Sequence, residues 1–148
     1  MIERIFHFNI NCTDIERAVA FYQLFGFKII LDFRDGMASQ EMAEAFGMQA
    51  ANLKGVHLRI GDAPDATRID LLQFIDPPAA GQPYPHLGHT GIARMCLHTT
   101  DIERDYRELI AKGVKFLTEP KRLPGTSVSI VCCKDPDGTF VELLEGDF

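Results

Sequence analysis

Residues 13–17 read TDIER, and the same five letters return unchanged at residues 100–104, an offset of 87 positions. The correspondence continues past the pentapeptide, because Gly26 falls on Gly113 at the same offset. A glycine in the left-handed conformation commonly ends a helix, so both copies have a helix stop at the same place. Self-similarity at a fixed offset indicates two copies of one supersecondary unit.

Each copy predicts a strand followed by an amphipathic helix. The runs before the repeated pentapeptide, 5–12 and 92–99, alternate in the manner of strands. Asp14 and Asp101 are good helix N-caps. Apolar residues then recur at three- and four-residue spacing and form one core-facing stripe per helix. The stripes comprise Ile15, Ala18, Val19, Tyr22 and Phe25 in the first copy, and Ile102, Tyr106, Leu109 and Ile110 in the second.

Three further strands are expected after each helix, which makes the unit β-α-β-β-β and the fold α+β. Residues 76–90, rich in proline and glycine, predict a linker between a first module, 1–75, and a second, 91–148. An insertion at 34–54 occurs in the first half alone and predicts a short capped helix from Ser39 to Phe46. The predicted strands span 27–31, 56–60 and 69–74 in the first half, and 114–117, 127–132 and 140–144 in the second.

Composition limits the classes of partner. The chain has 148 residues, 46% of them hydrophobic, and a formal net charge of -6, without any long run of lysine and arginine. These features argue against nucleic acid and membrane as partners and leave small-molecule chemistry or protein contact. Of these we expect a small-molecule substrate. The N-terminal residues lack the layout of a signal peptide, and we expect a cytoplasmic protein. The four cysteines lie in apolar, strand-like runs and are expected to be buried, inert thiols.

The duplicated unit, His7 placed seven residues before Asp14, and the closing segment DPDGTFVEL at 135–143 together resemble the vicinal oxygen chelate superfamily. That superfamily includes glyoxalase I, methylmalonyl-CoA epimerase, extradiol dioxygenases, and fosfomycin- and bleomycin-resistance proteins. The resemblance covers nearly the whole chain and implies a single domain, 1–148, in which the two modules form a curved mixed-sheet cup. It also implies a homodimer.

The resemblance further implies a divalent metal ion, held by residues on the first and last strands of the modules. The matching positions are His7, Asp70, Arg94 and Glu142. Arg94 departs from the pattern, since many members carry a histidine there and a guanidinium has no lone pair for a metal. The metal set is therefore His7, Asp70 and Glu142, and the ion Zn, Ni, Mn or Mg. An extradiol dioxygenase binds iron with two histidines and one carboxylate, and this set has only one histidine. Neither His57 nor His98 matches the pattern as a second one, so dioxygenase activity ranks lower.

Strand alternation assigns further residues to the cavity. It directs Phe6 and Phe8 toward the helix, and it directs the polar residues of the two first strands away from it. The expected substrate-binding residues are Asn9, Asn11, Arg94, Cys96 and His98.

Two interpretations of the four motif positions stay open. In the first, the metal polarises a carbonyl while Arg94 and Glu142 act as catalytic residues on the substrate oxygen and proton. In the second, the Arg94 guanidinium takes the metal's place between Asp70 and Glu142, no metal binds, and the site anchors an anion.

The favoured function is a metal-assisted isomerase or lyase that acts on a small carbonyl compound or anionic thioester, as in glyoxalase I or the epimerase. The alternative is a non-catalytic binding protein of the bleomycin-resistance kind. With no tryptophan and three tyrosines, the chain offers few of the aromatic walls that such a binder uses.

Overall fold

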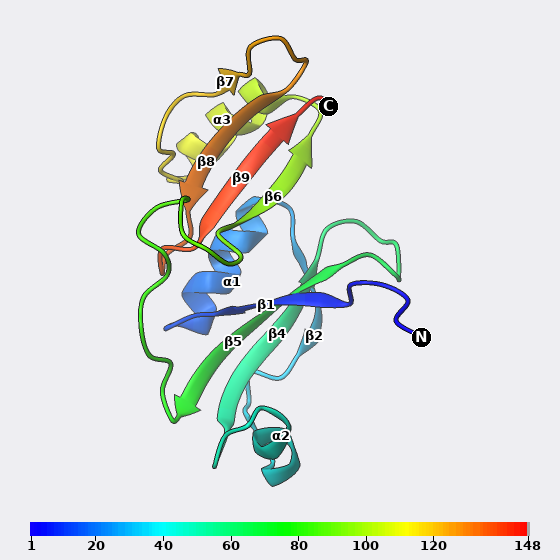
Figure 1. Cartoon of the computed structure of the whole chain (residues 1–148), viewed down its shortest axis with the longest axis vertical. Coiled ribbons are helices and arrows are strands. Elements are labelled where there is room, and N and C mark those ends of the chain that lie inside the picture. The colour runs from blue at the N-terminus through cyan, green and yellow to red at the C-terminus, as the bar shows by residue number, and fades with distance from the viewer. Residues whose placement is uncertain (148) are drawn as a thin grey trace. The chain divides into compact units, whose positions relative to one another are not determined.

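The computed structural model describes residues 1–147 and divides the chain into two compact units, Met1–Gly81 and Gln82–Phe148. Each unit contains a mixed β-sheet and one ten-residue helix, so the predicted α+β class is confirmed (Figure 1). The division between the units falls within residues 76–90, the predicted linker.

The first unit forms a sheet with the strand order β1-β5-β4-β2, and β3 pairs with the outer part of β4. β1 runs parallel to β5, whereas β2 and β5 are both antiparallel to β4. The elements are β1 (His7–Asn11), α1 (Ile15–Leu24), β2 (Lys28–Asp32), β3 (Met37–Ala38), α2 (Gln40–Ala45), β4 (Asn52–Arg59) and β5 (Arg68–Asp76).

The second unit repeats this plan with the strand order β6-β9-β8-β7, in which β6 runs parallel to β9 and the other pairs are antiparallel. Strands β6, β9 and β8 therefore correspond to β1, β5 and β4. The elements are β6 (Arg94–Thr99), α3 (Ile102–Ala111), β7 (Lys121–Arg122), β8 (Ser129–Lys134) and β9 (Phe140–Glu145).

The two helices begin where the repeat predicts. The Asp14 carboxylate accepts a hydrogen bond of 3.0 Å from the Arg17 backbone N–H, and Asp101 accepts one of 2.9 Å from Arg104. Each bond satisfies one of the backbone donors that a helix leaves unpaired in its first turn. In the α1 stripe Ile15, Ala18, Val19 and Tyr22 are buried as predicted, and Phe25 is half-buried. In the α3 stripe Ile102 and Leu109 are buried and Tyr106 is half-buried, but Ile110 is exposed, so its predicted burial is wrong.

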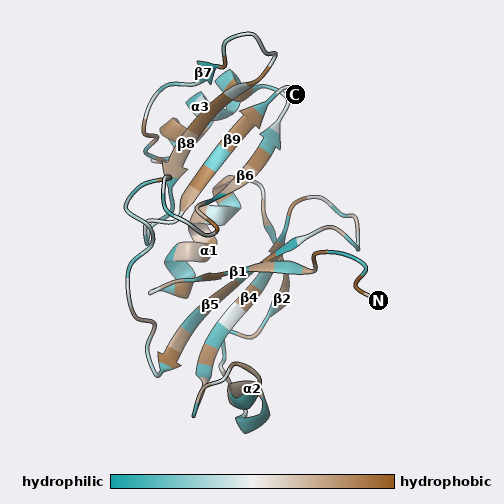
Figure 2. Ribbon diagram, viewed as in Figure 1, coloured by the Kyte–Doolittle hydropathy of each residue, from teal (hydrophilic) through white to brown (hydrophobic). Residues whose placement is uncertain are grey.

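The core of each unit lies between its helix and one face of its sheet. Figure 2 shows apolar and polar residues interspersed along β4, β5 and β9, and in β4 they alternate from Val56 to Arg59. In β4, for example, Val56 and Leu58 are fully buried, whereas His57 and Arg59 are half-buried. In this part of β4 the alternation leaves the second face of the sheet to polar side chains.

Two sequence predictions are wrong. Residues 114–117 form no strand but a single bridge between Phe116 and Cys133, because the chain bends at 117–119 and Pro120 has no N–H to continue a ladder. Phe6 contacts His7 and His57 and therefore does not face α1 as predicted. Phe8 pairs with the buried Ile69 and so lies on the predicted face, but both rings are partly exposed, at 46% for Phe6 and 40% for Phe8. The reason is that β1 is an edge strand, and α1 lies against β5 and β4 instead.

No helix within residues 1–147 is both long and apolar enough to cross a membrane.

Candidate metal centre

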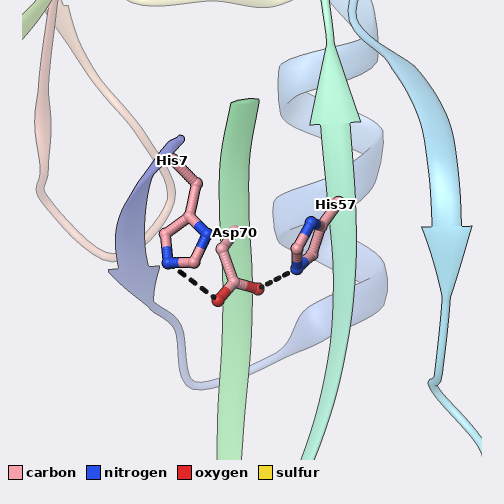
Figure 3. Close-up of side chains that lie close together, drawn as sticks. All are labelled: His7, His57 and Asp70. Carbon is pink, nitrogen blue, oxygen red and sulfur yellow. Dashed lines mark ion pairs between the residues drawn. The ribbon is translucent and has the colours of Figure 1, made fainter. Parts of the chain in front are cut away.

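Three neighbouring strands of the first unit bring two imidazoles to one carboxylate. His57 on β4 lies directly opposite Asp70 on β5, and paired residues project from the same face of a sheet. His7 reaches the same carboxylate from β1, on the other side of β5 (Figure 3). The Nε2 atom of His57 is 3.4 Å from Asp70 Oδ1, and the Nε2 atom of His7 is 3.9 Å from Asp70 Oδ2.

The donor set fits a divalent transition-metal ion. One ligand atom from each residue lies within 4.8 Å of the other two, and no other such group of three occurs among residues 1–147. Donors bound to one ion at about 2.1 Å are about 3.0 to 3.4 Å apart, so small side-chain rotations close the site. Asp70 Oδ1 and His57 Nδ1 are buried without a hydrogen-bond partner. An ion would satisfy the first of these atoms.

Burial sets the charge state of the cluster. Burial lowers the pKa of His57, against the opposing effect of the Asp70 charge, so His57 is neutral at pH 7 and keeps a lone pair for a metal. Burial also raises the pKa of Asp70, although both imidazoles oppose this shift. Desolvation is therefore the largest cause of both pKa shifts. In such a poorly solvated site, the attraction between a bound cation and the Asp70 carboxylate is strong.

Aromatic rings surround the cluster. The Phe6 ring lies edge-on to His7 and His57, with centroids 5.5 and 6.4 Å away, so it borders the site that the sequence directed it away from. The Phe33 ring packs against His57 at 5.9 Å. Gly55, two residues before His57 on β4, leaves the space that the Phe33 ring occupies. These contacts fix the orientation of the His57 imidazole.

We expect Gly55→Ala to disturb both the fold and the cluster. A Cβ at residue 55 would lie 2.6 Å from the Leu72 side chain and still closer to the Phe33 ring, which would have to move. Overpacking of this kind costs about 1 to 3 kcal/mol, to be measured by urea unfolding. The double variant Gly55→Ala/Phe33→Leu makes room for the new methyl group and should recover part of the loss. If the single variant is as stable as the wild type, this packing argument fails.

In the second unit, the strand positions that correspond to the cluster carry different side chains. Cys96, Glu142 and Cys132 are paired across β6, β9 and β8 just as Asn9, Asp70 and His57 are paired across β1, β5 and β4. The Glu142 carboxylate is buried, and it forms an ion pair with Arg94 Nε. It also accepts hydrogen bonds from the two thiols, at 3.5 Å from Cys96 and 3.8 Å from Cys132. The second unit thus supplies its own cation to the buried carboxylate.

The residues expected from the sequence fall into two groups. His7 and Asp70 come together in the first unit, whereas Glu142 and Arg94 pair with each other in the second. The buried Glu142 thus has the partner that its burial requires.

The expected substrate-binding residues are spread over both sheets. Asn9 donates a hydrogen bond of 3.1 Å to the Asp70 main-chain oxygen, which ties β1 to β5 beside the cluster. Asn11 is exposed at the end of β1, and Cys96 and His98 are exposed on β6.

His57 is the residue that the sequence analysis missed. Alternation within the run from Val56 to Arg59 places His57 on the polar face, and this signal is present in the sequence. The pairing of His57 with Asp70 could not be predicted from the sequence. A short turn would fix the register of two strands, but β4 and β5 are joined by an eight-residue loop. The second histidine that the motif positions lack is therefore supplied by an inner strand.

The expectation of four buried thiols is correct for Cys12 and Cys133 and wrong for Cys96, which is exposed; Cys132 is intermediate. None of the four forms a disulfide among the described residues. Partial burial, with the nearby Glu142 carboxylate as the second cause, raises the pKa of Cys96 to about 11. Burial also raises the pKa of Cys133 to about 12.

We therefore expect Cys96 to react slowly with iodoacetamide despite its exposure. At pH 8 about one thiol in a thousand is ionised when the pKa is about 11, and the higher nucleophilicity of the thiolate offsets only part of this. Peptide mapping should give a rate about 20-fold below that of a free cysteine peptide. In Glu142→Gln the negative charge is removed and the rate should rise. A Cys96 rate equal to that of the peptide would contradict the raised pKa.

Comparison with protein families gives a match over residues 4–143 to the model described as Glyoxalase/Bleomycin resistance protein/Dioxygenase superfamily. The chain belongs to this superfamily. The match spans both units and agrees with the duplicated topology. Comparison with curated protein sequences gives no match.

Solved structures share the superfamily's fold. A glyoxalase family protein from Bacillus cereus is 16% identical, with a TM-score of 0.86 over 98% of this chain and 95% of that one. Glyoxalase I from Zea mays is 21% identical, with a TM-score of 0.66 over 97% of this chain and 45% of the maize enzyme. The trypanothione-dependent glyoxalase I from Leishmania major is 19% identical, with a TM-score of 0.66 over 97% and 87%. At these identities the likeness concerns the fold.

Proposed function

We propose that this superfamily member is a metal-assisted isomerase or lyase acting on a small carbonyl compound, and that His7, His57 and Asp70 hold its metal ion. The observation that carries the proposal is the convergence of two imidazoles and one buried carboxylate on three adjacent strands. The glyoxalase I enzymes among the structural relatives add support to this type of chemistry. An anionic thioester is the alternative substrate.

The donor types narrow the choice of metal. Two imidazole nitrogens suit Zn, Ni or Fe, whereas Mg prefers ligand sets made of oxygen. Among the ions expected from the sequence, Zn and Ni therefore fit these residues better than Mn and Mg. When bound, such an ion acts as a Lewis acid that polarises the substrate carbonyl.

The chain's own residues prepare the site for that chemistry. His57 stays neutral because it is buried, and its ring is held between the Phe33 and Phe6 rings. Asn9 holds β1 against β5 and so fixes His7 relative to Asp70. The His57 and Asp70 side chains are only 13% and 10% exposed, and this low exposure strengthens the electrostatic interaction between them.

The test is proton exchange by the reconstituted protein. Protein loaded separately with Zn, Ni or Mn is incubated in D2O with a panel of small α-hydroxycarbonyl compounds and acyl thioesters, and exchange next to the carbonyl is followed by NMR. We expect metal-dependent exchange that His57→Ala abolishes and that His86→Ala, an exposed histidine of the second unit, leaves unchanged. No exchange with any metal and any member of the panel would overturn the proposal.

A second candidate function is iron-dependent oxygenation, and His57 is the observation that favours it. The motif positions hold one histidine, which disfavours dioxygenase activity, but His57 supplies the second imidazole. Two histidines and one carboxylate form the donor set of non-haem iron(II) oxygenases. Oxygen consumption by anaerobically iron-loaded protein, with catechols as substrates, distinguishes this activity from proton transfer.

A further inference from the structure

Two arginines lie beside the His7–His57–Asp70 cluster, on the same face of the sheet. Arg59 follows His57 by two residues on β4, and Arg68 precedes Asp70 by two residues on β5. Residues two apart in a strand point to the same face, with about 6.8 Å between their Cα atoms. Both arginines are half-buried.

Neither guanidinium is neutralised by a carboxylate in the described part of the chain. Arg59 Nε is buried without a hydrogen-bond partner. The Arg68 guanidinium lies 4.5 Å from the centre of the Phe6 ring, the ring that also contacts His7 and His57. An unpartnered donor on a half-buried arginine is costly unless a ligand or water satisfies it.

Several other cations of the protein have acidic partners. Lys28, which pairs with Arg59 across the sheet, is bonded to Asp62 at 3.2 Å. Arg34 is bonded to Asp32, and Arg104 to Asp105. The chain as a whole carries a net charge of -6, so two uncompensated guanidinium groups beside one carboxylate form a local positive field in an acidic protein.

We propose that Arg59 and Arg68 form an anion subsite that binds a carboxylate or phosphate group of the substrate next to the cluster. This inference rests on the proposed function, and it narrows the substrate class to anionic carbonyl compounds. Guanidinium groups recognise carboxylate and phosphate through paired N–H donors, and the half-buried Arg59 and Arg68 side chains each carry such a group. The subsite would orient the carbonyl end of the molecule toward His7, His57 and Asp70.

The binding test uses the metal-free full-length protein, so its outcome does not depend on whether the chain binds a metal or catalyses a reaction. Calorimetric titrations with malonate, with inorganic phosphate and with the neutral malonamide are compared at low salt. We expect both anions, but not malonamide, to bind, with an affinity that falls as salt increases. Stronger binding of malonate than of phosphate would identify the group as a carboxylate, and the reverse order as a phosphate.

Matched variants separate the subsite from the overall charge. Arg59→Gln and Arg68→Gln should each weaken anion binding at least fivefold. Arg104→Gln, on α3 in the second unit, removes the same charge elsewhere and should change binding less than twofold. Circular dichroism checks that each variant is folded. If the anions bind no better than malonamide, or if Arg104→Gln weakens binding as much as the other two variants, the subsite does not exist.

Discussion

His57→Ala is expected to weaken divalent metal binding by about 100-fold or more, although His57 is outside the positions that the family motif marks. Loss of groups that merely orient a ligand costs about 10- to 100-fold in metal affinity, so loss of a ligand should cost at least as much. Removal of His57 leaves one imidazole and one carboxylate in the cluster. Competition between the protein and a chromophoric chelator, for Zn and Ni in turn, measures this change.

The control for this experiment is His86→Ala, which removes an exposed histidine of the second unit and should leave the affinity unchanged. His7→Ala should match His57→Ala, because each histidine contributes one nitrogen to the same carboxylate. Equal affinity of the wild type and His57→Ala would show that the imidazole on β4 is not a ligand.

Arg94→Ala is expected to destabilise the protein by about 2 to 3 kcal/mol in urea unfolding. The variant leaves the Glu142 carboxylate, whose side chain is 5% exposed, without its ion-pair partner. Breaking a buried pair from one side costs about 3 to 5 kcal/mol. The lower value is expected because the Arg94 side chain is 44% exposed and water already screens the pair.

The double variant Arg94→Met/Glu142→Met tests the cause of that loss. Replacing both partners by apolar side chains removes the unpaired charge, so its stability should return to within about 1 kcal/mol of the wild type. A double variant that is as unstable as Arg94→Ala would show that the loss comes from packing and not from the stranded carboxylate.

The repeat in the sequence was sufficient to predict the plan of the fold. TDIER located both helix N-caps, because a capping carboxylate acts within three residues of itself, and such local interactions can be read from sequence. The strand at 114–117 was overestimated because its apolar residues suit a strand, while Pro120 and the bend before it end the pairing after one bridge. The strand propensity of a short segment does not determine how many residues pair with the neighbouring strand.

The candidate site depended on pairings that a single sequence does not encode locally. His7 and Asp70 were identified from their motif positions, and the structure brings them within 3.9 Å of each other. His57 joins them because β4 and β5 align it opposite Asp70, a register fixed by the packing of whole strands. Arg94 was recognised as a departure from the motif, and its pairing with Glu142 follows from the need of a buried carboxylate for a partner.

The central claim is that a metal is held by His7, His57 and Asp70 within the first unit. Two isosteric variants test it most directly, Asp70→Asn and Glu142→Gln, with metal content measured by plasma mass spectrometry after loading and dialysis. The account predicts about one ion per chain in the wild type and in Glu142→Gln, and little or none in Asp70→Asn. Loss of the ion in Glu142→Gln, or its retention in Asp70→Asn, would contradict the account.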